Sequence, residues 1–156
     1  MAFLFLQQGN SIASATVMKK VFLSFADQDA QKIQELLPLL SSPEYELDFY
    51  PGPLVVDIAA PEAEGIKRAI GEKIVKCNTV VCLISENTHS SKWVDLQLQK
   101  NRNKGNRIIA MALKGTQEAV LPALVRQENL TFYPWDPQRL KRLIAEEEKN
   151  IFNNSI

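Results

Sequence analysis

Short apolar runs alternate along this chain with apolar residues repeated at helical spacing. The runs are rich in β-branched and aromatic residues and are bounded by polar turn signals, as buried strands are. The run Cys77–Ile84 is the most continuous and is typical of a central strand covered on both faces. The pattern predicts strands at 21–25, 47–50, 77–84, 108–113 and 130–135.

Between these runs, apolar residues recur three and four positions apart, which indicates amphipathic helices. We expect Asp27 to cap the first helix, which ends before Ser41-Ser42-Pro43. Ser90 or Ser91 caps the third helix, and Gly105 ends it. Helices are predicted over 28–40, 61–76, 92–104 and from 138 onward, where the apolar residues reach Ile151.

Strict alternation of strands and helices implies right-handed βαβ units and a parallel sheet. The sequence therefore predicts a flavodoxin-like, three-layer α/β domain with a five-stranded parallel sheet of order 2-1-3-4-5. Ligands of such sheets lie beyond the carboxyl ends of the strands, where the winding reverses. Here that point lies between the first and third strands, which brings residues 24–29 and 85–97 to one rim.

Length and charge restrict the domain count and the partners. The chain has 156 residues, which suits one domain. We expect this domain to span 18–156, and we leave 1–17 as an N-terminal extension of uncertain status. Because 18 basic residues balance 18 acidic ones, no global field favours nucleic acid or an anionic membrane.

The N-terminal segment and the cysteines indicate a cytoplasmic protein, and the cysteine and histidine spacing indicates no metal site. The apolar stretch Phe3–Leu6 is too short to span a bilayer and follows no basic region, so secretion is not expected. Cys77 and Cys82 are interpreted as buried thiols in a reducing compartment. His89 is the single histidine, and no CxxC or HxxxH spacing occurs, so no metal site is predicted.

Several familiar sites are absent from the sequence. It contains no GxGxxG, no GxxxxGK[ST] and no GxSxG, which disfavours dinucleotide-binding turns, P-loops and serine hydrolases. The third strand ends in Ile84-Ser85 without the aspartate of a receiver domain. The segment Ala26–Asp29 is too acidic to bind a flavin phosphate. A receiver-like or flavin-binding protein is therefore the weaker interpretation.

The rim carries a more specific pattern. An apolar strand is followed by a serine, a polar loop, Ser91-Lys92-Trp93-Val94 and a helix, and the chain's first strand reads VFLSFADQD. This pattern resembles the TIR and TIR-like domain families. The stretches Glu64–Ile74, Val80–Trp93 and Asn103–Ile109 most resemble the TIR-like proteins of bacterial Thoeris antiphage systems. The resemblance covers about Lys19 to Gly115.

This resemblance implies NAD as substrate, with no further cofactor. Family members that act on NAD cleave its nicotinamide–ribose bond with a glutamate four residues after the tryptophan. In this chain Trp93 is followed at that spacing by Gln97, so Gln97 occupies the catalytic position. The resemblance also implies substrate-binding roles for a further set of residues: Ser24, Phe25, Asp57, Ser85, Asn87 and Trp93.

Gln97 decides what the site can do. Loss of nicotinamide leaves an oxocarbenium-like ribose, which a carboxylate stabilises and a neutral amide does not. The amide keeps nearly the size and hydrogen-bonding reach of glutamate. Three explanations are open: a substitution introduced to trap a ligand, a natural loss that leaves a binding module, or a helix register different from the predicted one.

Two functions follow as hypotheses. In the first, the chain is an NAD-consuming enzyme, weakened by Gln97, that makes an ADP-ribose-derived cyclic or conjugated signal in bacterial antiviral defence. That diffusible signal acts on a separate effector protein. In the second, the chain is a catalytically silent TIR-like module that binds a nucleotide or protein, or self-associates into a homo-oligomer.

Overall fold

A computed structural model describes residues 18–146 of the chain. One sheet with all neighbouring strands parallel forms its centre, in the order β2-β1-β3-β4-β5. This is the predicted fold class and strand order. The strands are β1 (Lys19–Ser24), β2 (Tyr45–Asp48), β3 (Thr79–Ile84), β4 (Arg107–Ala112) and β5 (Phe132–Tyr133).

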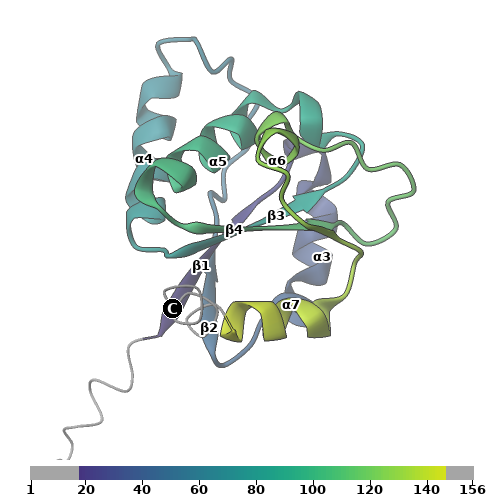
Figure 1. Cartoon of the computed structure of the whole chain (residues 1–156). Helices are drawn as coiled ribbons and strands as arrows, with labels where there is room; N and C mark the ends of the chain where they lie inside the picture. The colour runs from purple at the N-terminus through teal and green to yellow at the C-terminus, as the bar shows by residue number, and fades with distance from the viewer. Residues whose placement is uncertain (1–17, 147–156) are drawn as a thin grey trace, which may run out of the picture.

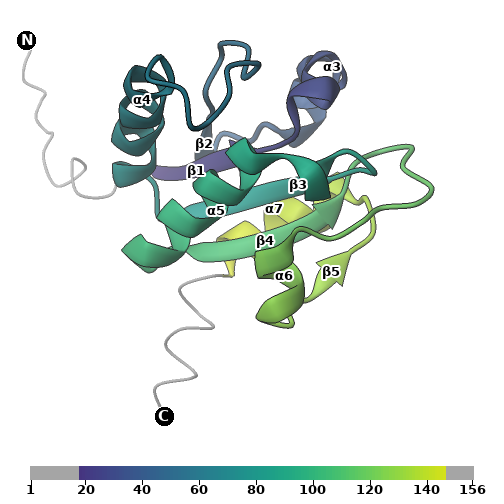
Figure 2. The same cartoon turned by 90° about the horizontal axis from the view of Figure 1, so that it is seen from above.

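Helices cover both faces of the sheet and complete the three layers (Figure 1). Helices α4 and α5 lie on one face together with the short α6, and α3 and α7 lie on the other (Figures 1 and 2). Two short 3-10 helices precede α3 and α5. The helical segments are η1 (Asp27–Asp29), α3 (Ala30–Leu40), α4 (Ala63–Val75), η2 (Thr88–Ser90), α5 (Lys92–Lys104), α6 (Ala123–Gln127) and α7 (Pro137–Ala145).

Strand β3 joins the two apolar cores because its side chains alternate between the faces. Val81 and Leu83 pack with the α3 and α7 layer, whereas Val80, Cys82 and Ile84 pack with the α4 and α5 layer. All six residues of the strand are buried. The run is continuously apolar because helices cover the strand on both faces, as the sequence indicated.

The structure corrects several element boundaries. Asp27 does not cap α3, because η1 intervenes and neither helix has a side-chain cap bond at its start. Strand β2 begins two residues before the predicted Leu47, and β5 has only two residues. Helix α6 was not predicted, since five residues are too few to show a helical period. Residues 1–17 and Ile151 lie outside the described residues.

Candidate functional site

The carboxyl ends of β1 and β3 meet where the strand order predicts a binding site. Ser24 is the last residue of β1 and pairs in register with Cys82 of β3. The Ser24 hydroxyl donates a hydrogen bond of 2.5 Å to Gln97 Oε1 on α5. Because Ser24 is fully buried and Gln97 is 3% exposed, this polar pair lies inside the molecule.

Helix α5 holds Gln97 at this point because both of its ends are fixed. The Ser91 side chain accepts a hydrogen bond of 3.1 Å from a backbone N–H of the first turn, as predicted for its cap. Gly105 ends the helix at φ 90°, a conformation that favours glycine. Trp93 and Gln97, one turn apart, are both buried, and Asp95 between them is exposed. The predicted helix register is therefore correct.

A small cavity lies in front of Gln97. Its volume is about 30 Å³, which holds a water molecule and no nucleotide. Its walls come from the end of β1, the start of α3, α5 and the chain after β2. The lining residues are Leu23, Phe25, Asp27, Ala30, Gln34, Phe49, Tyr50, Pro51, Gly52, Leu54 and Gln97.

Residues 49–62, here called the covering segment, connect β2 to α4 and lie between α3 and α4 (Figure 2). Hydrogen bonds from η1 and α5 hold the middle of this segment. Asp27 Oδ1 accepts a bond of 3.0 Å from Leu54 N, and Trp93 Nε1 donates one of 2.9 Å to the Val56 carbonyl oxygen. A ligand larger than water therefore enters the cavity only when the covering segment moves.

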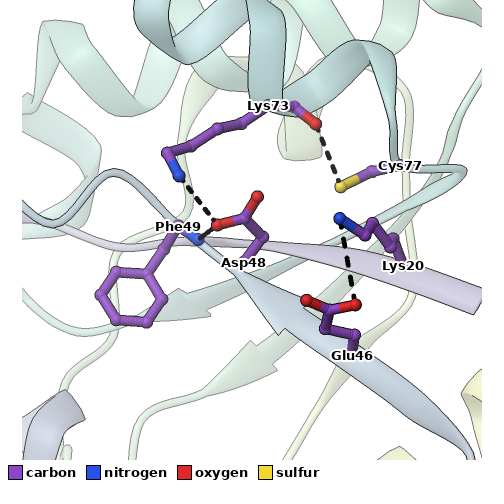
Figure 3. A network of polar contacts seen from close by, with 6 residues as sticks. All are labelled: Lys20, Glu46, Asp48, Phe49, Lys73 and Cys77. Carbon is purple, nitrogen blue, oxygen red and sulfur yellow. Dashed lines mark hydrogen bonds and ion pairs between the residues drawn. The ribbon is translucent and has the colours of Figure 1, made fainter.

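Aromatic rings form one wall of the cavity. The rings of Phe25 and Phe49 meet edge to face, with centroids 5.9 Å apart, and Tyr50 lines the same space. Asp48 Oδ1 accepts a 2.9 Å hydrogen bond from Phe49 N and pairs with Lys73 Nζ of α4 at 3.1 Å (Figure 3). These contacts tie the end of β2 to α4 and fix the point from which the Phe49 ring projects.

A second polar cluster lies at the end of β3. The Asp29 carboxylate, 9% exposed, accepts hydrogen bonds from Ser85 Oγ at 2.6 Å and Asn87 Nδ2 at 3.3 Å. The Asn87 backbone N–H donates to Ser85 Oγ at 3.0 Å. Ser85 and Asn87 are not among the lining residues of the cavity. Their polar atoms bind Asp29 and shape the loop that leads into α5.

The structure brings three of the seven predicted site residues together at the cavity. Phe25 and Gln97 line it, and Ser24, which does not line it, donates a hydrogen bond to Gln97. Trp93 packs in the core beneath the covering segment, and Asp57 is exposed and accepts a bond from the Ala59 backbone N–H. The remaining two belong to the Asp29 cluster. The roles of all seven in binding or catalysis stay predictions.

Sequence reasoning missed the cavity residues that the covering segment supplies. Phe49 and Tyr50 were assigned only to the end of a predicted strand, and Leu54 stands in a stretch with no helical or strand period, so no pattern marked the three as cavity residues. One signal was available: Phe49 and Tyr50 come just before Pro51-Gly52-Pro53 at the end of a predicted strand. An aromatic pair at the carboxyl end of a parallel strand lies on the rim where ligands bind.

A shallow groove of about 420 Å³ continues outward from the cavity. The two spaces share residues of η1, α3 and the covering segment, namely Asp27, Ala30, Gln34, Pro51 and Gly52. The groove adds Gln31 and Pro53. Once the covering segment has moved, an elongated ligand would have room to place one end near Gln97 and the other over the start of α3.

The two cysteines contribute no nucleophile to this region. Burial raises the pKa of Cys82 to about 12, and the nearby Asp95 carboxylate adds to the rise. Burial likewise raises the pKa of Cys77 to about 11. Both thiols are unpaired and buried, as predicted, and stay protonated near neutral pH.

Neither a metal cluster nor a membrane helix occurs in the part of the chain that the structure describes. Within residues 18–146, no three His, Cys, Asp or Glu side chains gather closely enough to hold a metal ion. No helix of the same residues has the length and apolar character needed to cross a bilayer. His89 lies exposed in η2.

Comparison with known sequences gives one family. The family described as Thoeris protein ThsB, TIR-like domain, matches residues 22–118 of this chain, which is more than half of its length. The matched stretch includes the second half of β1, the covering segment and the whole of α5. Curated individual proteins give no significant match in sequence.

Comparison with solved structures supports the same architecture. The TIR domain of the Toll-related receptor TRR-2 from Hydra magnipapillata aligns with a TM-score of 0.51 and 18% identity, over 86% of this chain and 95% of that domain. The CMP N-glycosidase BcmB from Clostridium botulinum aligns with a TM-score of 0.51 and 16% identity, over 81% of this chain and 99% of the enzyme. At such identities these likenesses show the fold alone.

Proposed function

Because this chain belongs to the family of the Thoeris protein ThsB TIR-like domain, we propose that it binds NAD with the nicotinamide–ribose bond beside Gln97. In this proposal the chain cleaves that bond slowly. The product is an ADP-ribose-derived signal, cyclic or conjugated, that acts on a separate effector in antiviral defence. The cytoplasm is the compartment proposed for this activity.

The observation that carries the proposal is the state of the Gln97 side chain. It is 3% exposed and lines the cavity, and its Oε1 is bound to Ser24 Oγ. No residue among 18–146 accepts a hydrogen bond from Gln97 Nε2. A buried donor without an acceptor is costly, so a ligand oxygen is a favourable partner for it. A ribose hydroxyl fits this requirement.

The chemistry of the bond explains why position 97 matters. When the ribose C1′–N bond breaks, its electron pair passes to the ring nitrogen and nicotinamide leaves neutral. Positive charge then develops on C1′ and the ribose ring oxygen, until water or a hydroxyl adds to C1′ and loses its proton. A carboxylate at position 97 would stabilise this charge, whereas the Gln97 amide binds the ribose without neutralising it.

Substrate entry requires movement of the covering segment. The cavity volume of about 30 Å³ is far below that of a nucleotide, and Leu54 and Val56 are tied to Asp27 and Trp93. A hydrogen bond between neutral groups contributes roughly 0.5–1.5 kcal/mol, and one to a charged group about 1.5–3 kcal/mol. The binding free energy of a nucleotide can offset the loss of both. Opening and closing of this segment would also exclude water from the reacting bond.

The test is to restore the carboxylate. The Gln97→Glu variant is expected to release nicotinamide from NAD about 10²–10³ times faster than the parent chain, because one preorganised electrostatic group is regained. Gln99→Glu is the matched control, because this substitution also replaces an amide by a carboxylate, but at an exposed position of α5. Nicotinamide is measured by chromatography. No release by Gln97→Glu above the Gln99→Glu level would remove the support for an enzyme.

A catalytically silent module is the second candidate, and the Gln97–Ser24 hydrogen bond favours it. The bond joins neutral partners inside the core, so position 97 is stably accommodated as an amide. In that case NAD or an ADP-ribose-derived nucleotide binds the parent chain, and Gln97→Glu also fails to cleave it. Calorimetric binding combined with the nicotinamide assay separates the two candidates.

A further inference from the structure

A single charged side chain, that of Asp27, lines the cavity and the outer groove among the described residues. No Lys or Arg of residues 18–146 takes part. A dinucleotide carries two phosphates, and side chains that bind phosphate are usually basic. The recognition of a nucleotide here therefore depends on another part of the ligand.

The walls around Asp27 favour positive charge. Phe25 and Phe49 directly follow β1 and β2, and their rings meet edge to face with centroids 5.9 Å apart. Tyr50 lines the same cavity. Aromatic faces attract cations, and most strongly where water is excluded. Asp27 contributes a full negative charge beside these rings, half-buried at the junction of the cavity and the groove. An aromatic cation satisfies both kinds of group.

Asp27 is positioned by the fold and not by a capping role. Its Oδ1 accepts from Leu54 N at 3.0 Å, which turns the carboxylate toward the covering segment instead of the start of α3. This bond uses one carboxylate oxygen. No other described residue hydrogen-bonds to the second oxygen.

We infer that Asp27 is a specificity-determining residue, which selects N-ribosides whose base is a cationic aromatic ring over those with a neutral base. The inference rests on the proposed function, in which the base is the nicotinamide ring of NAD. The oxidised ring is a pyridinium, whereas the reduced dihydropyridine ring of NADH is neutral. ADP-ribose keeps both phosphates and lacks the base altogether.

This role has a kinetic signature. The positive charge leaves the ring and moves to the ribose as the C1′–N bond breaks, so Asp27 stabilises the bound substrate more than the transition state. An interaction that weakens in the transition state affects affinity and not the rate of the chemical step. In the Gln97→Glu background, removal of the Asp27 charge should therefore raise KM and leave kcat unchanged or higher.

The experiment measures ligand preference by calorimetry, with NAD, NADH and ADP-ribose as nucleotides. The small cation 1-methylnicotinamide is compared with neutral nicotinamide as a probe without phosphate. The parent chain serves for all binding measurements, because Gln97 keeps turnover slow. Asp27→Asn removes the charge and retains an oxygen for Leu54 N, and Asp27→Glu retains the charge. Glu44→Gln is the control, because it removes one carboxylate charge at an exposed position that lines neither space.

We expect the parent, Asp27→Glu and Glu44→Gln to bind each cationic ligand about tenfold more tightly than its neutral counterpart, the effect of one partly screened charge pair. The preference should fall to within about twofold in Asp27→Asn. Circular dichroism of Asp27→Asn verifies that the variant is folded.

The outcomes separate this inference from the proposed function. NAD binding with the same preference in Asp27→Asn overturns the role of Asp27 and leaves the proposed function standing. Asp27-dependent binding of 1-methylnicotinamide without binding of NAD supports the role of Asp27 and contradicts the proposed function. No binding of any cation by the parent chain overturns both.

Discussion

A single hydrogen bond defines the environment of Gln97 at the scale of the residue. Ser24 Oγ donates to Gln97 Oε1 at 2.5 Å, where both side chains are buried. The same position would hold a glutamate carboxylate with its charge assisted by the hydroxyl. Ser24 can therefore donate to either side chain at position 97. Loss of its hydroxyl should lower the stability of the protein even without a ligand.

The Ser24→Ala variant tests this point. It leaves Gln97 Oε1 buried with no donor, so the free energy of unfolding should fall by about 1–3 kcal/mol. Denaturant unfolding measures the change. Ser90→Ala is the control, because Ser90 is exposed and donates to the Asn87 carbonyl oxygen, and it should change stability by less than about 0.5 kcal/mol. Equal losses in both variants would contradict a special role of the buried bond.

At the scale of the element, the covering segment is the part of the site that must move. Its hydrogen bonds to Asp27 and Trp93 come from η1 and α5, on either side of the cavity. The Asp29 cluster fixes the loop before α5 independently of this segment. Opening of the cavity can therefore occur while Gln97 stays in place.

The Trp93→Phe variant should loosen the covering segment. It removes the hydrogen bond from Trp93 Nε1 to Val56 O, worth roughly 0.5–1.5 kcal/mol, and keeps an aromatic ring in the core. Hydrogen exchange of residues 54–60 should accelerate by about threefold to tenfold, the change expected for such a free energy. Trp135→Phe, at the other core, is the control. Unchanged exchange in Trp93→Phe would mean that the bond does not hold the segment.

At the scale of the whole molecule, the reactivity of the cysteines measures how often the packing between the sheet and its covering helices opens. Cys77 and Cys82 both belong to the core between the sheet and α4 and α5. Burial raises the pKa of each thiol, to about 11 and about 12, so little thiolate exists in the folded protein near neutral pH. Their reactivity should follow opening of that core.

We therefore expect both thiols to react with a disulfide reagent at pH 8 at least about 100-fold more slowly in the native protein than in guanidinium chloride. The folded pKa values exceed the ordinary value of 9.0, so the stability that the protonated thiols contribute is intact below pH 9. It is lost as pH rises toward about 11 and above. Rapid reaction of one thiol in the native state would show a local opening beside that residue.

The sequence by itself determined the sheet order, the central strand and the helix that carries position 97. Each follows from a local pattern: the continuous run of β3, the alternation of elements, and the Ser91 cap with Gly105 at the end of α5. The spacing of Trp93 and Gln97 sufficed to place both on one face of α5, and the structure shows that this face is buried. Such patterns are predictable because they depend on residues close together in the chain.

Only the tertiary structure decided how the rim is used. The bond between Ser24 and Gln97 spans 73 positions, and the contact of Asp27 with Leu54 spans 27. Asp27 looked like a helix cap until its bond to Leu54 N was visible. The structure also shows that Ser85 and Asn87 bind Asp29, which no local pattern indicated. A polar side chain near a helix start or a strand end can serve as a local cap or bind a distant residue. Which purpose prevails depends on the donor that folding brings within about 3 Å, and no local pattern encodes that distance.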